Sequence, residues 1–373
     1  MSYLIEQIFN GLSLGCIYAF IALGYTMVYG IIKMINFAHG EFFMVGAFVG
    51  YFALVGLGLE TLPLAHPLPM VFSFMTAMLA AAMGAAILAV ITERVAYRPL
   101  QGASRIAALL TALGVSLLLQ NLGIQVFTAE QKGYPEARQY VSFEEAALYE
   151  GQTFEGQAYV LFDITSASGN TTEVRDPVAG PGKPLVSSGL KEAYAKRKRD
   201  GQPVAGFYID RPIPVEGVKA IIIISLALSF VLLWLLVQRT RFGRAMRAVS
   251  FNPEAARLMG IASGRVISTT FFVGAFLAGL GGIIWGMRYG KVEPFMGFMP
   301  GLKAFIAAVI GGIGSLQGAV LGGILLGVME VMIPAYLPSE YSGYKDAVAF
   351  VALIVILLVK PSGLLGRWEG QKV

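Results

Sequence analysis

The sequence predicts an all-α fold: a polytopic membrane helical bundle with eight or nine crossings and a small soluble α+β insertion on the external side. Composition is the first reason, because 56% of the 373 residues are hydrophobic, only 14% are charged and the mean hydropathy is +0.68. Soluble domains carry about a quarter charged residues. The second reason is a series of apolar runs long enough to cross about 30 Å of hydrocarbon. The third is one long polar stretch, 129–216, that separates two groups of these runs.

The apolar runs define the predicted spans in chain order. They cover 8–31, 40–59, 68–91, 106–128, 217–238, 266–287, 302–333 and 346–359. The first four runs build the first part of the bundle, 1–128, and the others build the second part, 217–373. The run 302–333 is longer than one span, so we expect it to cross twice or to re-enter. No basic segment precedes the first run and no cleavage pattern follows it, which predicts a retained span rather than a signal peptide.

Small residues recur at four-residue spacing within these runs. Such pairs let helices approach closely in lipid, so we expect a compact bundle with close helix crossings. The pairs are Gly11 with Gly15, Gly46 with Gly50, Gly282 with Gly286, Gly318 with Gly322, and Gly323 with Gly327.

The stretch 129–216 has the composition of a soluble domain. It holds 10 Lys/Arg and 13 Asp/Glu, for a net charge of −3. Two strand-like runs, 158–165 and 204–209, and a predicted helix, 190–199, indicate a small α+β insertion. Counting the loops from the basic ones places this insertion outside the membrane, in the periplasm or on the external side.

The polar segment 239–265 is predicted to be a cytoplasmic loop. It carries six arginines against the single acid Glu254, and an excess of basic residues in a short loop marks the cytoplasmic side. The overall charge of +5 comes from basic residues that lie beside the apolar spans, which is the distribution that orients a membrane protein. We therefore expect no nucleic acid partner. Membrane lipid is the surrounding medium.

A short helix with built-in ends is predicted inside that loop. Asn252 is a good N-cap, Pro253 suits the first helical position, and Gly260 suits the left-handed conformation that ends a helix. Two turns are far too short to span lipid, so this helix should lie at the membrane surface, available to another protein. The predicted docking set is Asn252, Pro253, Glu254, Ala255, Ala256, Arg257, Leu258, Met259 and Gly260.

Two further groups are candidates for a pathway or gate. Asn36, His39 and Glu41 bring an amide, an imidazole and a carboxylate together at the inner end of the second run. They either form a polar gate or start a helix, with Asn36 as its cap and Glu41 at the positive end of its dipole. Gly311, Gly312 and Gly314 weaken the run 302–333. They indicate either a tight turn between two spans or a broken helix that lines a cavity.

Enzymatic chemistry is not expected from this chain. The sequence has no phosphate-binding loop of the Gly-x-x-x-x-Gly-Lys-Ser/Thr type, and its single cysteine, Cys16, and two histidines predict neither a metal site nor a cofactor. Its charged residues in the runs, Glu41, Glu93, Lys303, Glu330 and Lys345, all fall near predicted span ends. We therefore expect no proton or sodium relay in the interior.

Four motifs together resemble a known family. They are Met34-Ile-Asn-Phe-Ala-His-Gly-Glu41, Gly24-Tyr-Thr-Met-Val-Tyr-Gly30, the run from Lys303 to Ser315, and Lys360-Pro-Ser-Gly-Leu-Leu-Gly366. This set is similar to the H-type permease subunit of branched-chain amino acid ABC importers. Glu254-Ala-Ala-Arg-Leu-Met-Gly260 also resembles the core of the coupling loop of ABC importers, although Thr270 stands where many of them have isoleucine. The insertion 129–216 departs from the shorter family pattern.

The resemblance implies a heteromeric importer in the cell inner (plasma) membrane. A second homologous permease subunit would complete the pore, two ABC ATPase subunits would bind the segment 239–265 as a coupling loop, and an external solute-binding protein would deliver the amino acid. Three alternatives remain open: a permease of an importer for urea or short-chain amides, a passive channel for small solutes, and a membrane-embedded structural or assembly subunit without transport activity.

Overall fold

A computed structural model describes most of the transmembrane part of the chain. The described residues are 2–57, 67–100, 103–134, 153–154, 157–165, 171–177, 217–336, 343 and 345–366. The chain divides into two compact units, 3–142 with 215–373, and 143–214. Each unit is described by itself.

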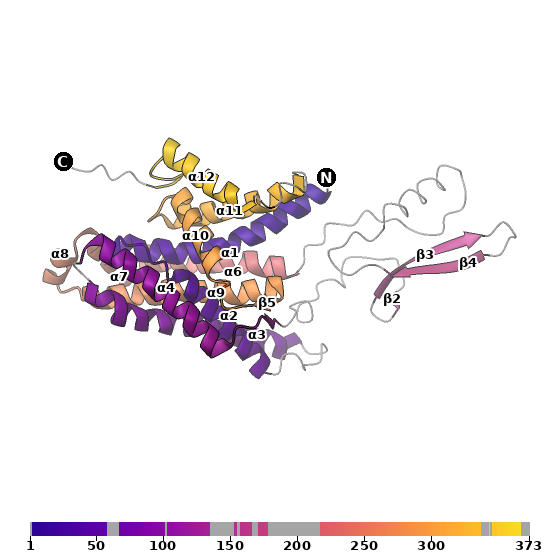
Figure 1. The fold of residues 1–373 in the computed structure, drawn as a ribbon, viewed down its shortest axis with the longest axis horizontal. Coiled ribbons are helices and arrows are strands. Elements are labelled where there is room, and N and C mark those ends of the chain that lie inside the picture. The colour runs from indigo at the N-terminus through magenta and orange to yellow at the C-terminus, as the bar shows by residue number, and fades with distance from the viewer. Residues whose placement is uncertain are drawn as a thin grey trace. The chain divides into compact units, whose positions relative to one another are not determined.

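The first unit is a bundle of helices (Figure 1). Its first part contains α1 (Ser2–Ile32), α2 (His39–Gly56), α3 (Pro67–Thr92) and α4 (Arg105–Phe127). Between α3 and α4 the helix continues as a π-helical turn, η1 (Glu93–Tyr97), and a 3-10 turn, η2 (Arg98–Leu100). The second part contains α6 (Gly217–Arg239), α7 (Arg241–Phe251), α8 (Pro253–Leu258), α9 (Ser263–Tyr289), α10 (Phe298–Gly311), α11 (Leu316–Tyr336) and α12 (Lys345–Val359).

Within the described residues, seven helices are long and apolar enough to cross a membrane. They are α1, α2, α3 with its π turn, α4, α6, α9 and α11, and two shorter apolar helices, Phe298–Gly311 and Ala349–Val359, add to them. The predicted fold class, a helical membrane bundle, is confirmed. The predicted break within 302–333 is also found, because α10 ends at Gly311 and α11 begins at Leu316.

Two small sheets accompany the helices. In the bundle, β1 (Lys132–Gly133) pairs antiparallel with β5 (Lys291–Val292). In the second unit, β2 (Thr153–Phe154), β3 (Gln157–Thr165) and β4 (Thr171–Pro177) form a three-stranded antiparallel sheet in the order β2-β3-β4. The predicted strand 158–165 therefore corresponds to β3. The predicted helix 190–199 and strand 204–209 lie outside the described residues.

The centre of the bundle is formed by α1, α2 and α9. In their most apolar stretches, 83% of the α1 residues and 78% of the α9 residues are buried, compared with 17% for α6. The i, i+4 row Met75, Leu79, Met83, Ile87 and Ile91 of α3 faces outward, as a lipid-facing stripe does.

Several of the small-residue pairs lie at the closest helix contacts. A Cβ atom added to Gly15 would lie 2.6 Å from the Cα of Ile324, and one added to Gly327 would lie 2.2 Å from the backbone nitrogen of Gly15. The backbones of α1 and α11 thus meet with no room for a side chain between them. This is the contact that small residues permit in lipid, where van der Waals packing drives helix association.

Three of the charged residues that the sequence placed near span ends, and therefore outside the interior, are in fact buried. Glu93 and Glu41 are 0% and 1% exposed, and Lys303 is 5% exposed. Their positions in the sequence suggested helix ends, but neighbouring helices cover those ends. Lys303 of α10 forms ion pairs with Glu330 of α11 at 2.6 Å and with Asp346 of α12 at 2.7 Å. The interior of the bundle therefore does hold paired charges.

Candidate functional site

The short helix predicted within the segment 239–265 is present as α8. The side-chain oxygen of Asn252 accepts hydrogen bonds from the backbone nitrogens of Glu254 and Ala255, each at 3.0 Å. Pro253 occupies the first helical position. Gly260 has φ +79°, the left-handed conformation in which glycine carries no steric penalty. The local prediction from capping residues is thus confirmed at both ends of the helix.

Large apolar side chains project from this element instead of packing into the bundle. Leu258 is 89% exposed, Met259 is 82% exposed and Phe251, at the end of α7, is 94% exposed. Such exposure away from the apolar spans is unusual, because these side chains gain no burial within the chain. Ala256 is the exception at 4% exposed, so it faces the chain itself.

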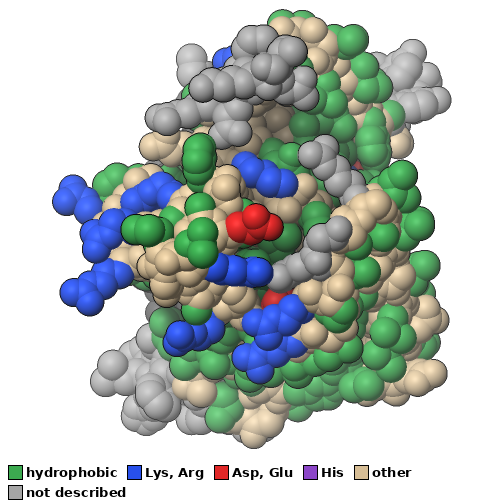
Figure 2. All heavy atoms as spheres, turned by 90° about the vertical axis from the view of Figure 1, so that its left-hand side faces the viewer, with side chains coloured by type: hydrophobic (Ala, Val, Ile, Leu, Met, Phe, Trp, Pro, Cys, Tyr) green, Lys and Arg blue, Asp and Glu red, His purple; other side chains and the backbone are tan. Residues whose placement is uncertain are grey.

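Basic side chains surround the same element. Figure 2 shows Lys and Arg side chains gathered on the face of the molecule where α7 and α8 lie in Figure 1, with green apolar side chains among them. The exposed arginines of this segment are Arg239, Arg241, Arg244, Arg247, Arg257 and Arg265. This mixture of cations and protruding apolar groups is suited to a protein partner with an acidic, partly apolar groove.

Polar contacts seat α8 on the bundle. The hydroxyl of Ser263, at the start of α9, donates to the carbonyl oxygen of Pro253 at 3.2 Å. The backbone nitrogen of Ile261 donates to the carbonyl of Ala256 at 3.0 Å. At the end of α7, the hydroxyl of Ser250 donates to the carbonyl of Gly30 in α1. The start of α9 is therefore hydrogen-bonded directly to α8.

The motif around Asn36 does not form the predicted N-cap. Helix α2 begins at His39, its N-cap residue is Ala38, and no side chain caps it. The oxygen of Asn36 instead accepts a hydrogen bond from the hydroxyl of Tyr97 at 2.6 Å. The capping interpretation was wrong because a buried tyrosine from a distant part of the chain takes the acceptor.

The start of α2 lies inside the bundle rather than at its end. A Cβ atom added to Gly24 would lie 2.0 Å from Nε2 of His39, and Gly24 lies eight residues before Ile32, the last residue of α1. The segment 33–38 between α1 and α2 therefore folds back along α1, by about 12 Å at 1.5 Å per residue, before α2 begins. The first turn of α2 there meets the start of α10, because a Cβ atom on Gly40 would lie 2.4 Å from the carbonyl oxygen of Gly297.

Glu41 is buried at this meeting of two helix N-termini. Its Oε1 accepts hydrogen bonds from Ser116 at 3.0 Å and from Gln120 at 2.8 Å, both on α4. Its Oε2 has no hydrogen-bond partner among the described residues. Ser116 and Gln120 are four residues, about one helical turn, apart on α4, so both can reach the same carboxylate. This i, i+4 spacing of two polar residues in a predicted span was the sequence signal for a buried polar partner. His39 is also buried, with its ring centroid 4.8 Å from that of Tyr25.

The glycines of the second gate candidate form a tight turn between α10 and α11. Gly312 has φ +109° and Gly314 has φ +92°. The backbone nitrogens of Leu364 and Leu365 donate to the carbonyls of Ile310 and Gly311 at 2.8 Å each. The free carbonyls at the end of α10 are thus satisfied by the C-terminal segment.

The structure does not bring the two gate candidates together. The Asn36–Glu41 motif contacts the start of α10 near Gly297, whereas Gly311 is the last residue of this 14-residue helix. At 1.5 Å per residue, the two ends of α10 lie about 20 Å apart.

Comparison with known proteins places the chain in a family. A family model described as branched-chain amino acid transport system / permease component matches residues 7–358. The high-affinity branched-chain amino acid transport system permease protein LivH of Escherichia coli K12 is 37% identical over 375 residues, which cover 100% of this chain and 98% of LivH. The corresponding protein BraD of Pseudomonas aeruginosa is 35% identical over 99% of this chain and 98% of BraD.

More distant relatives match part of the chain. The probable branched-chain amino acid transport permease protein LivH of Methanocaldococcus jannaschii is 31% identical over 42% of this chain and 52% of its own length. No solved structure matches this chain. The relatives named here are transport permeases and not enzymes. With a helical membrane bundle and a match over nearly its whole length, the chain belongs to the family of permease components of branched-chain amino acid transport systems.

Proposed function

We propose that this chain is one of two membrane subunits of an ATP-driven importer that carries branched-chain amino acids across the cell inner (plasma) membrane. A second homologous permease completes the pore, two ABC ATPase subunits bind on the cytoplasmic side, and an external solute-binding protein delivers the amino acid. The insertion 129–216 belongs to the external side. The main support is the α7–α8 element, whose exposed apolar and basic side chains need a protein partner.

The contact with the ATPase is made by the exposed part of α8. Leu258 and Met259 enter an apolar groove, while Arg257 pairs with an acid of the partner. Asn252, Pro253, Glu254 and Ala255 shape the first turn of the helix, and Gly260 ends it. Ala256 is buried within the chain, so its part is to seat α8 on α9. Movement of the ATPase subunits on ATP binding then displaces α8 and α9 together.

The gate is the place inside the bundle where α2 and α10 begin. Asn36, His39 and Glu41 supply its polar groups. Discontinuous helices whose N-termini meet within the membrane are used by transporters to bind anionic groups. The glycine turn at Gly311, Gly312 and Gly314 lets α10 pivot at its other end. The proposal therefore treats α10 as the moving element between the two candidate groups.

Uptake by the reconstituted complex tests the function. We expect the tagged chain to co-purify with a second permease and an ATPase, and proteoliposomes of that complex to take up labelled leucine and valine. Uptake requires ATP on the ATPase side and binding protein on the other. Uptake of urea or acetamide in place of leucine would support the alternative importer, and flux without ATP or partners would support a passive channel.

A single substitution tests the docking surface. We expect Leu258→Asp to reduce co-purification of the ATPase and ATP-dependent uptake by at least about tenfold, because a carboxylate would enter the partner's apolar groove and lose about 1.4 kcal/mol or more. The side chain is 89% exposed, so the chain itself should fold normally. Leu258→Met, which keeps an apolar side chain, is the matched control. Wild-type association of Leu258→Asp would disprove this docking surface.

A further inference from the structure

The π-helical turn η1 lies between the docking helix and the start of α2. π-helical turns are rare and are frequently found at functional sites. Two of its residues are buried, Glu93 at 0% and Tyr97 at 5% exposure. Each forms a short hydrogen bond to a different part of the bundle, so the turn connects two segments that do not follow each other in the sequence.

Glu93 connects the turn to the docking side. Its Oε2 accepts a hydrogen bond from the hydroxyl of Ser268 at 2.6 Å. Ser268 lies in α9 five residues after Ser263, which binds the carbonyl of Pro253 in α8. Arg98, in the next turn η2, lies close to both Glu93 and α9: its guanidinium is beside Gly264 of α9, and its Nε is 3.9 Å from Oε1 of Glu93. The start of α9 therefore contacts the turn through Ser268 and lies close to Arg98.

Tyr97 connects the turn to the gate side. Its hydroxyl donates to the side-chain oxygen of Asn36 at 2.6 Å, and both groups are buried. The carbonyl of Asn36 in turn accepts from the backbone nitrogen of His39 at 3.0 Å, the first residue of α2. The ring of Tyr97 packs against Phe271 of α9, with centroids 5.6 Å apart.

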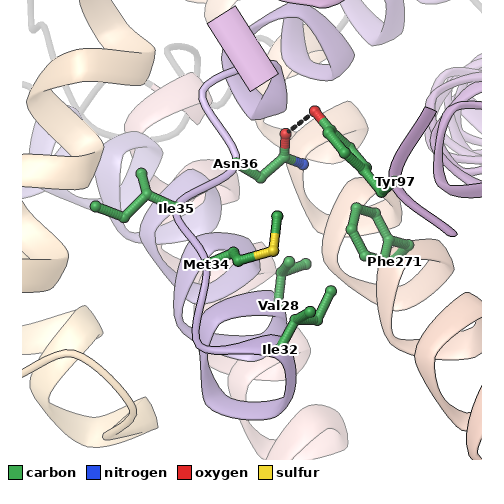
Figure 3. A pocket seen from close by; sticks show the side chains of 7 residues that line it. All are labelled: Val28, Ile32, Met34, Ile35, Asn36, Tyr97 and Phe271. Atoms are coloured by element: carbon green, nitrogen blue, oxygen red, sulfur yellow. Dashed lines mark hydrogen bonds between the residues drawn. The ribbon is translucent and has the colours of Figure 1, made fainter. Parts of the chain in front are cut away.

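A small cavity lies beside the Tyr97–Asn36 hydrogen bond (Figure 3). Its volume is about 10 Å³, and its lining residues are Val28, Ile32, Met34, Ile35, Asn36, Tyr97 and Phe271. The amide nitrogen of Asn36 has no hydrogen-bond partner among the described residues. The cavity volume is about that of one water probe, so the cavity marks an imperfectly packed spot beside the segment 33–38. Among the described residues, Tyr97 is the one hydrogen-bond partner of the Asn36 side chain.

We propose that the π turn Glu93–Tyr97 is the joint that transmits displacement of α8 and α9 to the segment 33–38 and so to the buried start of α2. Glu93 and Tyr97 are positioning residues in this scheme: they contact no substrate and act through Ser268 and Asn36. The inference rests on the proposed function, in which α8 is moved by an ATPase. It adds the route by which that movement reaches the gate.

The test removes one hydroxyl group and leaves the packing in place. For Tyr97→Phe in the reconstituted importer, we expect binding-protein-stimulated ATP hydrolysis within about twofold of wild type. Amino acid uptake per ATP should fall by about tenfold, in the range expected when a buried acceptor loses its donor. The matched control is Tyr134→Phe, since Tyr134 is equally buried at 4% exposure and its hydroxyl lies 3.5 Å from the carbonyl of Ala47. This control variant should leave the amount of amino acid taken up per ATP unchanged.

A second variant tests whether the two contacts act in series. Ser268→Ala breaks the link on the other side of the turn and should lower uptake per ATP in the same way. The double variant Tyr97→Phe/Ser268→Ala should be no worse than the more impaired single variant, because contacts on one route are not additive. If the losses of uptake per ATP in the two single variants multiply in the double variant, the proposed role of the π turn is wrong. It is also wrong if Tyr97→Phe leaves uptake per ATP unchanged, or if this variant lowers ATP hydrolysis and uptake equally.

A labelling experiment separates the joint from the transport function. In a Cys16→Ser background, Met34→Cys places a single thiol beside the cavity. We expect its reaction rate with a small maleimide to change at least about threefold when the ATPases are trapped with ATP, and not to change when Tyr97→Phe is added. The same nucleotide response in both backgrounds contradicts the joint. Absence of amino acid uptake by the wild-type complex contradicts the proposed function instead.

Discussion

Replacing Gly46 with valine should strongly destabilise the helical bundle. A Cβ atom at this position would lie 2.4 Å from the Cα and 3.0 Å from the carbonyl oxygen of Gly279, so α2 and α9 would have to separate. Gly279 is equally confined on its other side, where a Cβ atom would lie 2.7 Å from the carbonyl oxygen of Ala81 in α3. The clash is with backbone atoms that cannot rotate away. We expect a loss of at least about 3 kcal/mol.

The measurement is the yield of monodisperse protein after detergent extraction, together with its thermal unfolding. Gly114→Val is the matched control, because Gly114 lies in α4 and a Cβ atom there meets nothing within 4 Å. Both variants add the same β-branched side chain to a membrane helix, so the difference in melting temperature isolates the contact between α2 and α9. Equal melting temperatures would show that the helices do not meet at Gly46.

Removing the ammonium group of Lys303 is expected to have the second large effect. Its Nζ lies 2.6 Å from Oε1 of Glu330 and 2.7 Å from Oδ1 of Asp346. The other oxygen of Glu330 accepts from the hydroxyl of Tyr18 at 2.7 Å, so this network joins α1, α10, α11 and α12. In Lys303→Met the buried carboxylate of Glu330 keeps only the tyrosine. We expect a loss of about 3–5 kcal/mol in the free energy of unfolding.

A double variant decides whether that loss comes from the unpaired charge. Lys303→Met/Glu330→Gln removes both charges of the more buried pair and should recover most of the lost stability, because the main cost lies in leaving the Glu330 charge without its partner. Asp346 also loses its lysine, but its side chain is 39% exposed, so water can solvate it. Lys291→Met is the control for removing an exposed lysine and should change stability by less than about 0.5 kcal/mol. The energies are measured by reversible unfolding in mixed micelles. A stable Lys303→Met protein, with a double variant less stable than it, would contradict this account.

The short helix α8 and its ends could be predicted well from the sequence because their signals are local; its docking role stays a proposal. Asn252, Pro253 and Gly260 act on backbone groups within one or two turns, so no distant residue is needed to place the ends of α8. The exposure of Leu258 was not predicted. Whether a leucine in a short polar segment turns inward or outward depends on the helices that receive it, and these lie elsewhere in the chain.

The motif Asn36–Glu41 shows the limit of the same approach. Its residue types predicted a polar function or a helix start, and the helix does begin there. The partners Tyr97, Ser116 and Gln120 are 61, 75 and 79 residues away in the sequence, so no local rule identifies them. Because the side-chain oxygen of Asn36 accepts a hydrogen bond from Tyr97, it does not cap the N-terminus of α2 as the sequence predicted.

Hydropathy, glycine content and capping residues in the sequence determined that the chain is a helical membrane bundle, where the run 302–333 breaks, and which polar segment carries a short capped helix. These properties depend on transfer of whole segments into lipid and on backbone hydrogen bonds within a few residues. Only the tertiary structure decided that α2 begins deep in the bundle, that Glu93 and Lys303 are buried and paired, and that a π turn lies between α9 and Asn36. Those features arise from contacts between distant helices, whose energies no single segment contains.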